Sequence, residues 1–502
     1  MNSRDATAKN DVPNPDYSYS STTTTTTKNH ETQSTSETDK FPLLFSKRLV
    51  IVTLLFVGNI TAFLIKYNVN VAVIDMTFQK RVKLGNVTII QQPEFRWNSK
   101  KMGTVTSLTA YGALLACTSG FVISKLGASL SCALCMMMCG ITTLLYTITL
   151  HYNFYSFVAC RLITGIFVGL HIPIHLEIFS RWVPQCERVS LMAFIYNGLS
   201  VGVMVVHPFC GLIAFKWGWP MIFYTTGSIS IIMAFLLLTL LKNSPSEDKS
   251  ISKKELVYIL NGLEIKNSTK KVVNPYRKIA TSLPVWALCI ANFVHMSGIC
   301  FLADCLPWYI KDITGKNIKD VGFITAIPNT VSMVMVLFTG FLLQYWKNNS
   351  NIPPTQMSKI IMASGFIIEM FLFLAITLVS DFITIMLILI AMRFITPLNS
   401  LNIQLIVINI APGHTGMIAG IAEFCSQLAA ILTQTIIGFL TANRSMEEWN
   451  RCFILIAGIC AFSTVIFTLF GSNEAQEWAL APSSNHKDDR YSPGSYIKTI
   501  TE

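Results

Sequence analysis

Charged residues are scarce in this 502-residue sequence: they make up 13% of it, about half the share found in typical soluble domains. Hydrophobic residues make up 52%. They gather in stretches of about 20 residues, the length that crosses the hydrocarbon core of a bilayer as a helix. The composition excludes a soluble globular protein and predicts a chain that lies mostly in lipid.

Several motifs are also lacking. Residues 1–40 are polar and hold no apolar core of a signal peptide, so the first apolar stretch is expected to direct insertion. The 13 cysteines show neither metal-ligand spacing nor a disulfide framework, which predicts small buried side chains. Because no nucleophile elbow, His-Glu-x-x-His motif or nucleotide loop occurs in a suitable context, we expect no enzyme activity, no cofactor and no metal.

Twelve apolar stretches are long enough to span a bilayer, and they fall into two sets of six. They cover residues 49–76, 103–123, 129–150, 155–179, 191–215 and 220–241, then 284–309, 321–346, 357–379, 382–408, 415–441 and 452–471. This pattern predicts an all-α polytopic membrane protein with two pseudo-symmetric six-helix halves around a site at the membrane midplane. The predicted parts are a disordered segment 1–48, a bundle 49–241, a linker 242–283, a bundle 284–471 and a disordered tail 472–502.

The basic residues set the expected orientation. The linker is rich in lysine and arginine, and the positive-inside rule places such a loop in the cytoplasm. Both termini are then cytoplasmic, and the 77–102 loop lies on the outer or lumenal side, although that loop is basic too. The net charge of +11 is explained by this topology, so we expect a lipid bilayer as partner and no nucleic acid.

The sequence also holds two kinds of signal, one for glycosylation and one for sorting. Asn86 and Asn443 begin glycosylation sequons in predicted outer loops. Asp39, Leu43 and Leu44 fit an acidic dileucine signal, which a sorting adaptor would read and which favours a lysosomal or endosomal membrane. The alternative is a plain apolar lead-in to the first span and a plasma-membrane location.

Short motifs along the chain resemble the solute carrier 17 family, which includes sialin, vesicular glutamate transporters and sodium-phosphate cotransporters. The resemblance covers about residues 45 to 480, in collinear order. The motifs include Lys66–Met76, Phe95–Ser99, Arg161 with Gly165 and Gly169, Ser180–Pro184, Ala291–Phe293, Ile410–Pro412 and Glu448–Trp449. The resemblance implies the major facilitator fold, alternating access, and small anions moved under a sodium gradient, a proton gradient or the membrane potential.

Basic side chains inside the predicted spans are the expected substrate contacts, because an ionisable group at that depth is costly unless it faces a cavity or a partner. They are Lys66, Arg161, His295 and Arg393. Several cations in one cavity suit a carboxylate or a phosphate. The resemblance implies an anion-binding role for Arg161, with Lys66 at a position where relatives carry arginine. The alternatives are a helix tether for Arg161, an acid pair or snorkelling for Arg393, and a simple core hydrogen bond for His295.

At two positions the sequence lacks acidic residues that the resembling family carries. Val168 and Asn409 stand where proton-coupled relatives carry a glutamate and an aspartate, so coupling by the family's usual route is in doubt. Asp304, Glu423 and His171 are the predicted substitutes for a proton or sodium site. Asp304 or Glu423 could instead pair with Arg393 in a structural role. Lys125, in a short basic loop between spans two and three, resembles the gating latch of major facilitator proteins.

The sequence therefore predicts a transporter of small organic or inorganic anions, coupled to Na⁺ or H⁺ or facilitative. Phosphate, an acidic sugar and an acidic amino acid stay open. Glutamate is least favoured, because Val105 and His295 stand where the glutamate transporters carry a histidine and an arginine. The alternative, suggested by the missing acids, is an anion sensor or scaffold that binds without transporting.

Overall fold

Twelve long apolar helices make up most of the described chain and are each long enough to cross a membrane. The computed structural model describes residues 42–43, 46–77, 80–84, 87–92, 94–95, 97, 99–263, 276–305, 309–310, 312, 318–441 and 445–479. These residues belong to one structural unit, 42–502. The predicted all-α polytopic fold is thereby confirmed.

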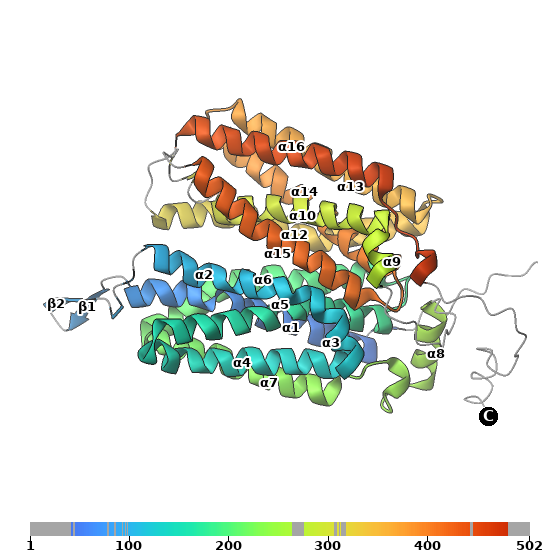
Figure 1. Cartoon of the computed structure of the whole chain (residues 1–502), viewed down its shortest axis with the longest axis horizontal. Coiled ribbons are helices and arrows are strands. Elements are labelled where there is room, and N and C mark those ends of the chain that lie inside the picture. Colours follow the sequence, from blue (N-terminus) through green and yellow to red (C-terminus); the bar gives the residue numbers. More distant parts are fainter. Residues whose placement is uncertain are drawn as a thin grey trace, which may run out of the picture. The chain divides into compact units, whose positions relative to one another are not determined.

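Six of the spans precede the linker and six follow it (Figure 1). The first six are α1 (Lys47–Thr77), α2 (Ser99–Ala113) continued by the 3₁₀ turn η1 (Leu114–Thr118) and α3 (Ser119–Leu126), α4 (Ala128–Tyr152), α5 (Phe154–Trp182), α6 (Arg188–Trp217) and α7 (Trp219–Leu240). The others are α10 (Leu283–Cys300) with the π-helical turn η3 (Phe301–Cys305), α12 (Ile318–Asn349), α13 (Pro354–Thr377), α14 (Phe382–Ile410), α15 (Thr415–Leu440) and α16 (Met446–Phe470).

Shorter elements mark the two ends of the helices. Strands β1 (Lys80–Leu84) and β2 (Val87–Gln91) form an antiparallel hairpin with Lys80 opposite Gln91. At the other end lie η2 (Pro245–Glu247), α8 (Lys253–Gly262), α9 (Tyr276–Thr281) and η4 (Glu477–Ala479). In Figure 1 the hairpin lies on the left and α8 and α9 on the right, so we call these ends the hairpin end and the linker end.

Small residues let α2 and α5 pack backbone against backbone. A Cβ atom at Gly165 would lie 2.6 Å from the carbonyl oxygen of Thr109, and one at Gly112 would lie 2.3 Å from that of Leu162. Both distances are shorter than van der Waals contact, so neither glycine tolerates a side chain. Close approach through small residues spaced four apart is the usual way in which membrane helices associate. It fixes the register of α2 against α5, and with it the surroundings of Arg161.

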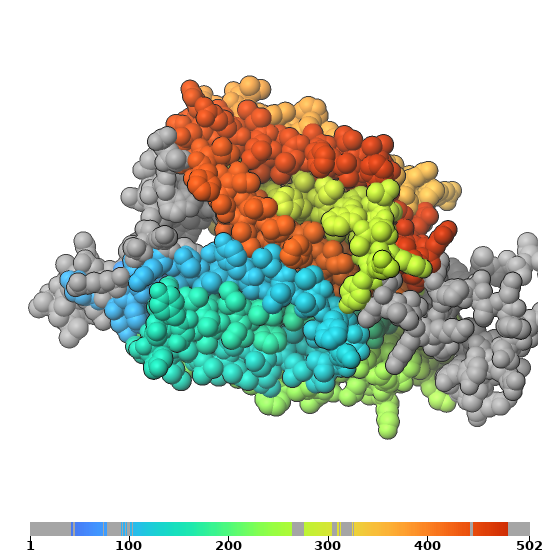
Figure 2. All heavy atoms as spheres, viewed as in Figure 1, coloured from blue at the N-terminus to red at the C-terminus, as the bar shows by residue number. Residues whose placement is uncertain are grey.

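The two bundles meet chiefly through α15 against α5 and α12 against α6. At the linker end, polar contacts join them: Ser119 Oγ donates to the Gly416 carbonyl at 2.7 Å, and Lys347 Nζ donates to the Gln185 carbonyl at 3.1 Å. In Figure 2 the blue and orange surfaces of the bundles are parted near the hairpin end and touch toward the linker end. The structure thus shows the bundles closed against each other at the linker end.

Candidate substrate and coupling sites

Arg161 lies on α5, fully buried at 0% exposure. Its Nη2 donates to Thr109 Oγ1 on α2 at 3.1 Å, and its guanidinium lies 5.8 Å from the ring centroid of Tyr146 on α4. Its Nε and Nη1 have no hydrogen-bond partner among the described residues. No carboxylate of the described chain forms an ion pair with it, so a buried cation carries donors that protein groups do not satisfy.

Tyr146, whose ring lies beside the Arg161 guanidinium, is held in place by a chain of hydroxyl groups. Tyr146 donates to Thr164 Oγ1 at 2.5 Å, and Thr164 exchanges a hydrogen bond of 2.8 Å with Thr142. Thr164 in turn donates to the Cys160 carbonyl at 2.9 Å. The hydroxyl of Tyr146 is therefore anchored to Thr164, which is itself held by Thr142 and the Cys160 carbonyl.

Lys66 and Glu423 bring opposite charges together from the two bundles. Lys66 on α1 is half-buried, with its Nζ 5.3 Å from the ring centroid of Phe63 and 5.6 Å from that of Tyr67. The charge of Lys66 acts on the Glu423 carboxylate of α15, as does Tyr196 of α6. Glu423 Oε1 also accepts from Gln427 Nε2 at 2.5 Å. Two predicted site residues, one from each bundle, thus interact electrostatically.

His295 and Arg393 lie together in the C-terminal bundle. His295 Nε2 is 2.7 Å from Ser400 Oγ, and the charge of Arg393 acts on the ring. Both side chains are 6% exposed. His295 also lines a small cavity, with room for about one water, together with Glu369 and Thr396. Arg161 and Lys66 lie in the other bundle, on α5 and α1.

The acid that faces Arg393 is Glu369 on α13, which the sequence analysis did not consider. Arg393, Thr396 and Asn399 of α14 all act on its carboxylate, which is 7% exposed. Glu423 interacts with other groups, and the side chain of Asp304 is outside the described residues. Glu369 could have been found by the rule that selected Glu423, since it too is an acid within a predicted span.

His171 lies against α1 and beside His175. Its Nε2 is 3.2 Å from Asn59 Oδ1 on α1, and its ring centroid is 3.7 Å from that of His175. Val168, one turn before it, is buried. Asn409, at the other departure from the family, accepts from Arg188 Nη1 at 3.0 Å and donates to Asn473 Oδ1 at 3.0 Å. Its amide therefore joins the two bundles at the linker end.

The remaining predicted residues are peripheral. Lys125 is exposed in the last turn of α3, with its Nζ 5.9 Å from the centroid of the Phe121 ring. Leu43 is half-buried and packs against the main hydrophobic core. The glycosylation residues and most of the dileucine element lie outside the described residues: Asn86, Asn443, Asp39 and Leu44.

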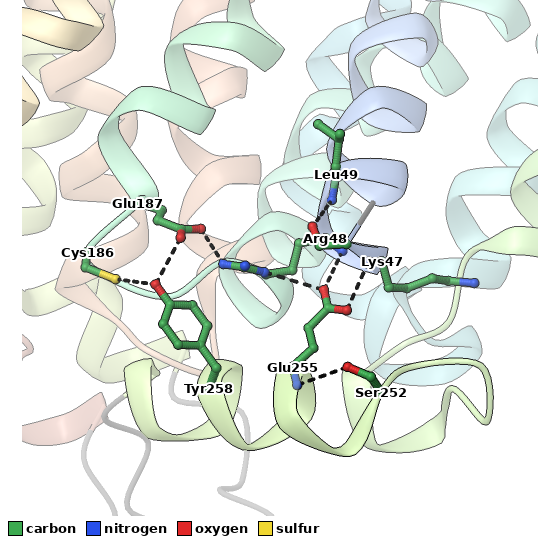
Figure 3. A network of polar contacts seen from close by, with 9 residues as sticks. Lys47, Arg48, Leu49, Cys186, Glu187, Ser252, Glu255 and Tyr258 are labelled. Atoms are coloured by element: carbon green, nitrogen blue, oxygen red, sulfur yellow. Dashed lines mark hydrogen bonds and ion pairs between the residues drawn. The ribbon is translucent and has the colours of Figure 1, made fainter. Parts of the chain in front are cut away.

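A polar network ties the linker to the first helix at the linker end (Figure 3). The Glu255 carboxylate of α8 accepts from the backbone N–H of Lys47 at 3.1 Å and of Arg48 at 2.9 Å, which caps the start of α1. Arg48 Nη1 donates to Glu187 Oε2 at 2.5 Å, and Tyr258 donates to Glu187 Oε1 at 2.9 Å. Burial, followed by the interactions with Cys186 and Glu187, raises the pKa of Tyr258, so the phenol keeps its proton.

Comparison with known proteins now identifies the family. The sequence profile of the Major Facilitator Superfamily matches residues 55–433. The chain belongs to this superfamily. It is therefore a multi-pass integral membrane transporter.

Curated relatives confirm the resemblance to the solute carrier 17 family. Vesicular glutamate transporter 3 of Danio rerio is 26% identical over 442 residues, covering 86% of this chain and 74% of the relative. Sialin of Homo sapiens is 26% identical over 469 residues, covering 89% and 93%. In fold, the chain is similar to the proton:xylose symporter XylE, with a TM-score of 0.62 at 15% identity, covering 86% of this chain and 98% of that structure.

Proposed function

We propose that this major facilitator protein transports small anions of the carboxylate or phosphate type by alternating access, and that Arg161 is their principal contact. The observation that carries the proposal is the fully buried guanidinium of Arg161, whose Nε and Nη1 find no partner among the described residues. A buried charge persists when something compensates it, and a bound anion would do so with charge-assisted hydrogen bonds. Relatives named for glutamate transport support the same substrate class.

The burial of Arg161 agrees with alternating access. A binding group that is 0% exposed needs a movement of the bundles before a solute reaches it. The linker-end contacts described above close that end of the protein. The hairpin end, where the bundles are parted, is then the expected route by which a solute enters. The predicted cytoplasmic termini, glycosylation and sorting signals, and lysosomal, endosomal or plasma-membrane location stay predictions.

Uptake into proteoliposomes tests the proposal. Labelled phosphate, glutamate, sialate and urate are offered under separately imposed sodium, proton and potential gradients to the wild type, to Arg161→Ala and to Arg161→Lys. Losing a hydrogen-bonded charge partner costs roughly 2 to 5 kcal/mol, so we expect uptake to fall at least about 30-fold in Arg161→Ala. Arg161→Lys keeps the charge and should retain part of the flux. Arg451→Ala, which removes an exposed arginine of α16, is the matched control.

Two outcomes would count against this function. Uptake that survives Arg161→Ala would remove Arg161 from the site. Binding that depends on Arg161 without flux of any of the anions would favour the alternative of an anion sensor, for which Val168 and Asn409 supply the reason, since neither can titrate.

We further propose that Glu423 couples transport to a cation gradient, with the proton or Na⁺ as the coupling ion. Its carboxylate interacts electrostatically with Lys66 of the opposite bundle, so neutralising it would weaken an attraction between the bundles. In Glu423→Gln we expect uptake to lose its dependence on the imposed gradient while exchange of labelled for unlabelled anion continues. Glu447→Gln, at an exposed position of α16, is the control. Gradient dependence retained in Glu423→Gln would exclude this residue as the coupling site.

A further inference from the structure

Three potential metal ligands meet in the N-terminal bundle, away from Arg161. Cys132 of α4 and His171 and His175 of α5 each offer one ligand atom, and these atoms all lie within 4.8 Å of one another. Tetrahedral coordination with bonds of about 2.0 to 2.3 Å spaces its ligand atoms roughly 3.4 to 3.8 Å apart, so small side-chain rotations suffice. His171 and His175 are one turn apart on one helix face, the spacing that gives two histidines to one metal ion in other proteins.

Three of the four ring nitrogens of His171 and His175 are buried and have no hydrogen-bond partner among the described residues. His175 is 4% exposed, and neither its Nδ1 nor its Nε2 has a hydrogen-bond partner among the described residues. His171 is 2% exposed, and its Nδ1 also lacks one. A buried polar atom left unpaired costs on the order of 1 to 3 kcal/mol, so three such atoms on neighbouring rings point to a ligand that the protein does not itself supply.

The tautomer of His171 follows from its surroundings. Asn59 Nδ2 donates to the Ile195 carbonyl at 2.9 Å, which turns Asn59 Oδ1 toward His171 as an acceptor. His171 Nε2 must then carry the proton of their 3.2 Å hydrogen bond. The lone pair of a neutral ring lies on Nδ1, the atom without a partner. A histidine that donates its other N–H to a carbonyl oxygen is the usual orientation of a metal ligand.

Electrostatics favours a monovalent ion. Among the described residues, no carboxylate or basic side chain other than the histidine pair itself acts on the two rings. Metal binding would release the Cys132 thiol proton and leave one thiolate with two neutral imidazoles. With Cu⁺ the centre is neutral, whereas Zn²⁺ would leave one uncompensated positive charge in a buried place. Thiolate and imidazole are also ligands that suit copper.

We infer that Cys132, His171 and His175 form a site for one soft metal ion, best suited to Cu(I), and that this ion joins α4 to α5 next to α1. The site lies about 15 Å along α5 from Arg161, since ten residues separate Arg161 from His171. It borders a cavity lined in part by Asn59, His175 and Tyr196, with room for about one water as a further ligand. The inference does not depend on the proposed anion transport.

Metal content of the purified chain tests the inference. The full chain, without a polyhistidine tag, is purified in detergent under anaerobic reducing conditions and titrated separately with buffered Cu(I) and with Zn²⁺. We expect about one Cu(I) per chain, with an affinity at least roughly tenfold lower in His175→Gln and in Cys132→Ser. Cys460→Ser, which removes a buried cysteine of α16, and His207→Gln, which removes an exposed histidine of α6, are matched controls and should bind as the wild type does.

A measurement on the wild type keeps the test decisive if a variant misfolds. X-ray absorption of the copper-loaded chain should show one sulfur and two nitrogen ligands. Spectra with several sulfurs, or binding that is equal in His175→Gln and His207→Gln, would overturn the site. Zinc bound by the same three residues in preference to copper would overturn the choice of ion.

Discussion

Glu177 on α5 joins Gly416 at the start of α15: the Gly416 amide donates to Glu177 Oε2 at 2.6 Å. The other carboxylate oxygen accepts from Arg181 Nε at 2.9 Å and Nη2 at 2.6 Å. Glu177 is 2% exposed, and its Oε2 keeps its partner only while the two bundles touch, whereas the bonds from Arg181 lie within α5. This contact, which we call the clasp, joins the two bundles at the linker end.

The first prediction concerns this clasp. Glu177→Gln keeps the shape but loses the charge that strengthens the hydrogen bond from the Gly416 amide, at a cost of about 1 to 3 kcal/mol. We expect a larger population open at the linker end, seen as longer spin-label distances between α3 and α13. Ser180→Ala, on the same helix, removes a hydroxyl that bonds only within α5 and is the control. An unchanged distance distribution would show that the clasp does not hold the bundles.

The second prediction concerns the positioning of Arg161. Thr109→Val removes the hydrogen bond to Nη2 while keeping the shape of the side chain. One such hydrogen bond contributes about 0.5 to 1.5 kcal/mol, so KM for the anion should rise roughly 3- to 10-fold with little change in the maximal rate. Thr106→Val, at an exposed position one turn earlier, should leave both constants unchanged. A fall in the maximal rate alone would point to a role in movement rather than in binding.

The third prediction concerns the cap on α1. Glu255 Oε1 also forms an ion pair with Arg48 Nε at 3.5 Å. Glu255→Gln therefore leaves Arg48, which is fully buried, with less compensation and weakens the cap on two backbone amides. Removing one partner of a buried ion pair costs about 3 to 5 kcal/mol, and since Glu187 remains, we expect a loss near the lower end. The midpoint of thermal unfolding in detergent should fall accordingly. Glu247→Gln, at an exposed position of the same linker, should leave it in place.

The fourth prediction concerns pH. Burial lowers the pKa of His414 below its usual 6.5, and the charge of Glu177 offsets this only in part. The folded state therefore binds fewer protons than the unfolded chain just below pH 6.5. The contribution of His414 to stability is complete above that pH and declines as the pH falls toward the folded-state pKa. The unfolding midpoint should drop between about pH 7 and 5 less steeply in His414→Gln than in the wild type. Equal slopes would exclude His414 as a contributor.

The sequence predicted the twelve spans because lipid imposes a simple rule: backbone groups must be satisfied within one helix, and about 20 apolar residues cross the bilayer. The break of the second span at Leu114–Thr118 and the hairpin at Lys80–Gln91 were not predicted. No proline marks the first. Short strands in a loop leave no mark in a pattern of membrane-length apolar runs.

Which side chains pair between helices could not be predicted from the sequence. Arg393, Glu369 and Glu423 were all visible as charges within spans, but which acid faces the arginine depends on the rotation and height of α13, α14 and α15. The meeting of Cys132 with His171 and His175 was hidden for the same reason, since the ligands come from two helices. Residues that act within one helix face, such as the histidine pair, are the ones that spacing can reveal.

The glycine contact between α2 and α5 limits what the transport cycle can change. Because the two backbones touch at Gly112 and Gly165, Thr109 and Arg161 travel as one rigid body. The contacts that we propose between Arg161 and an anion are then the same whichever way the protein faces. A ligand shifts a conformational equilibrium only through contacts that differ between the states. The energy difference that drives the switch must therefore come from groups carried by the other bundle, and mutations there should alter the direction and speed of the cycle more than the affinity.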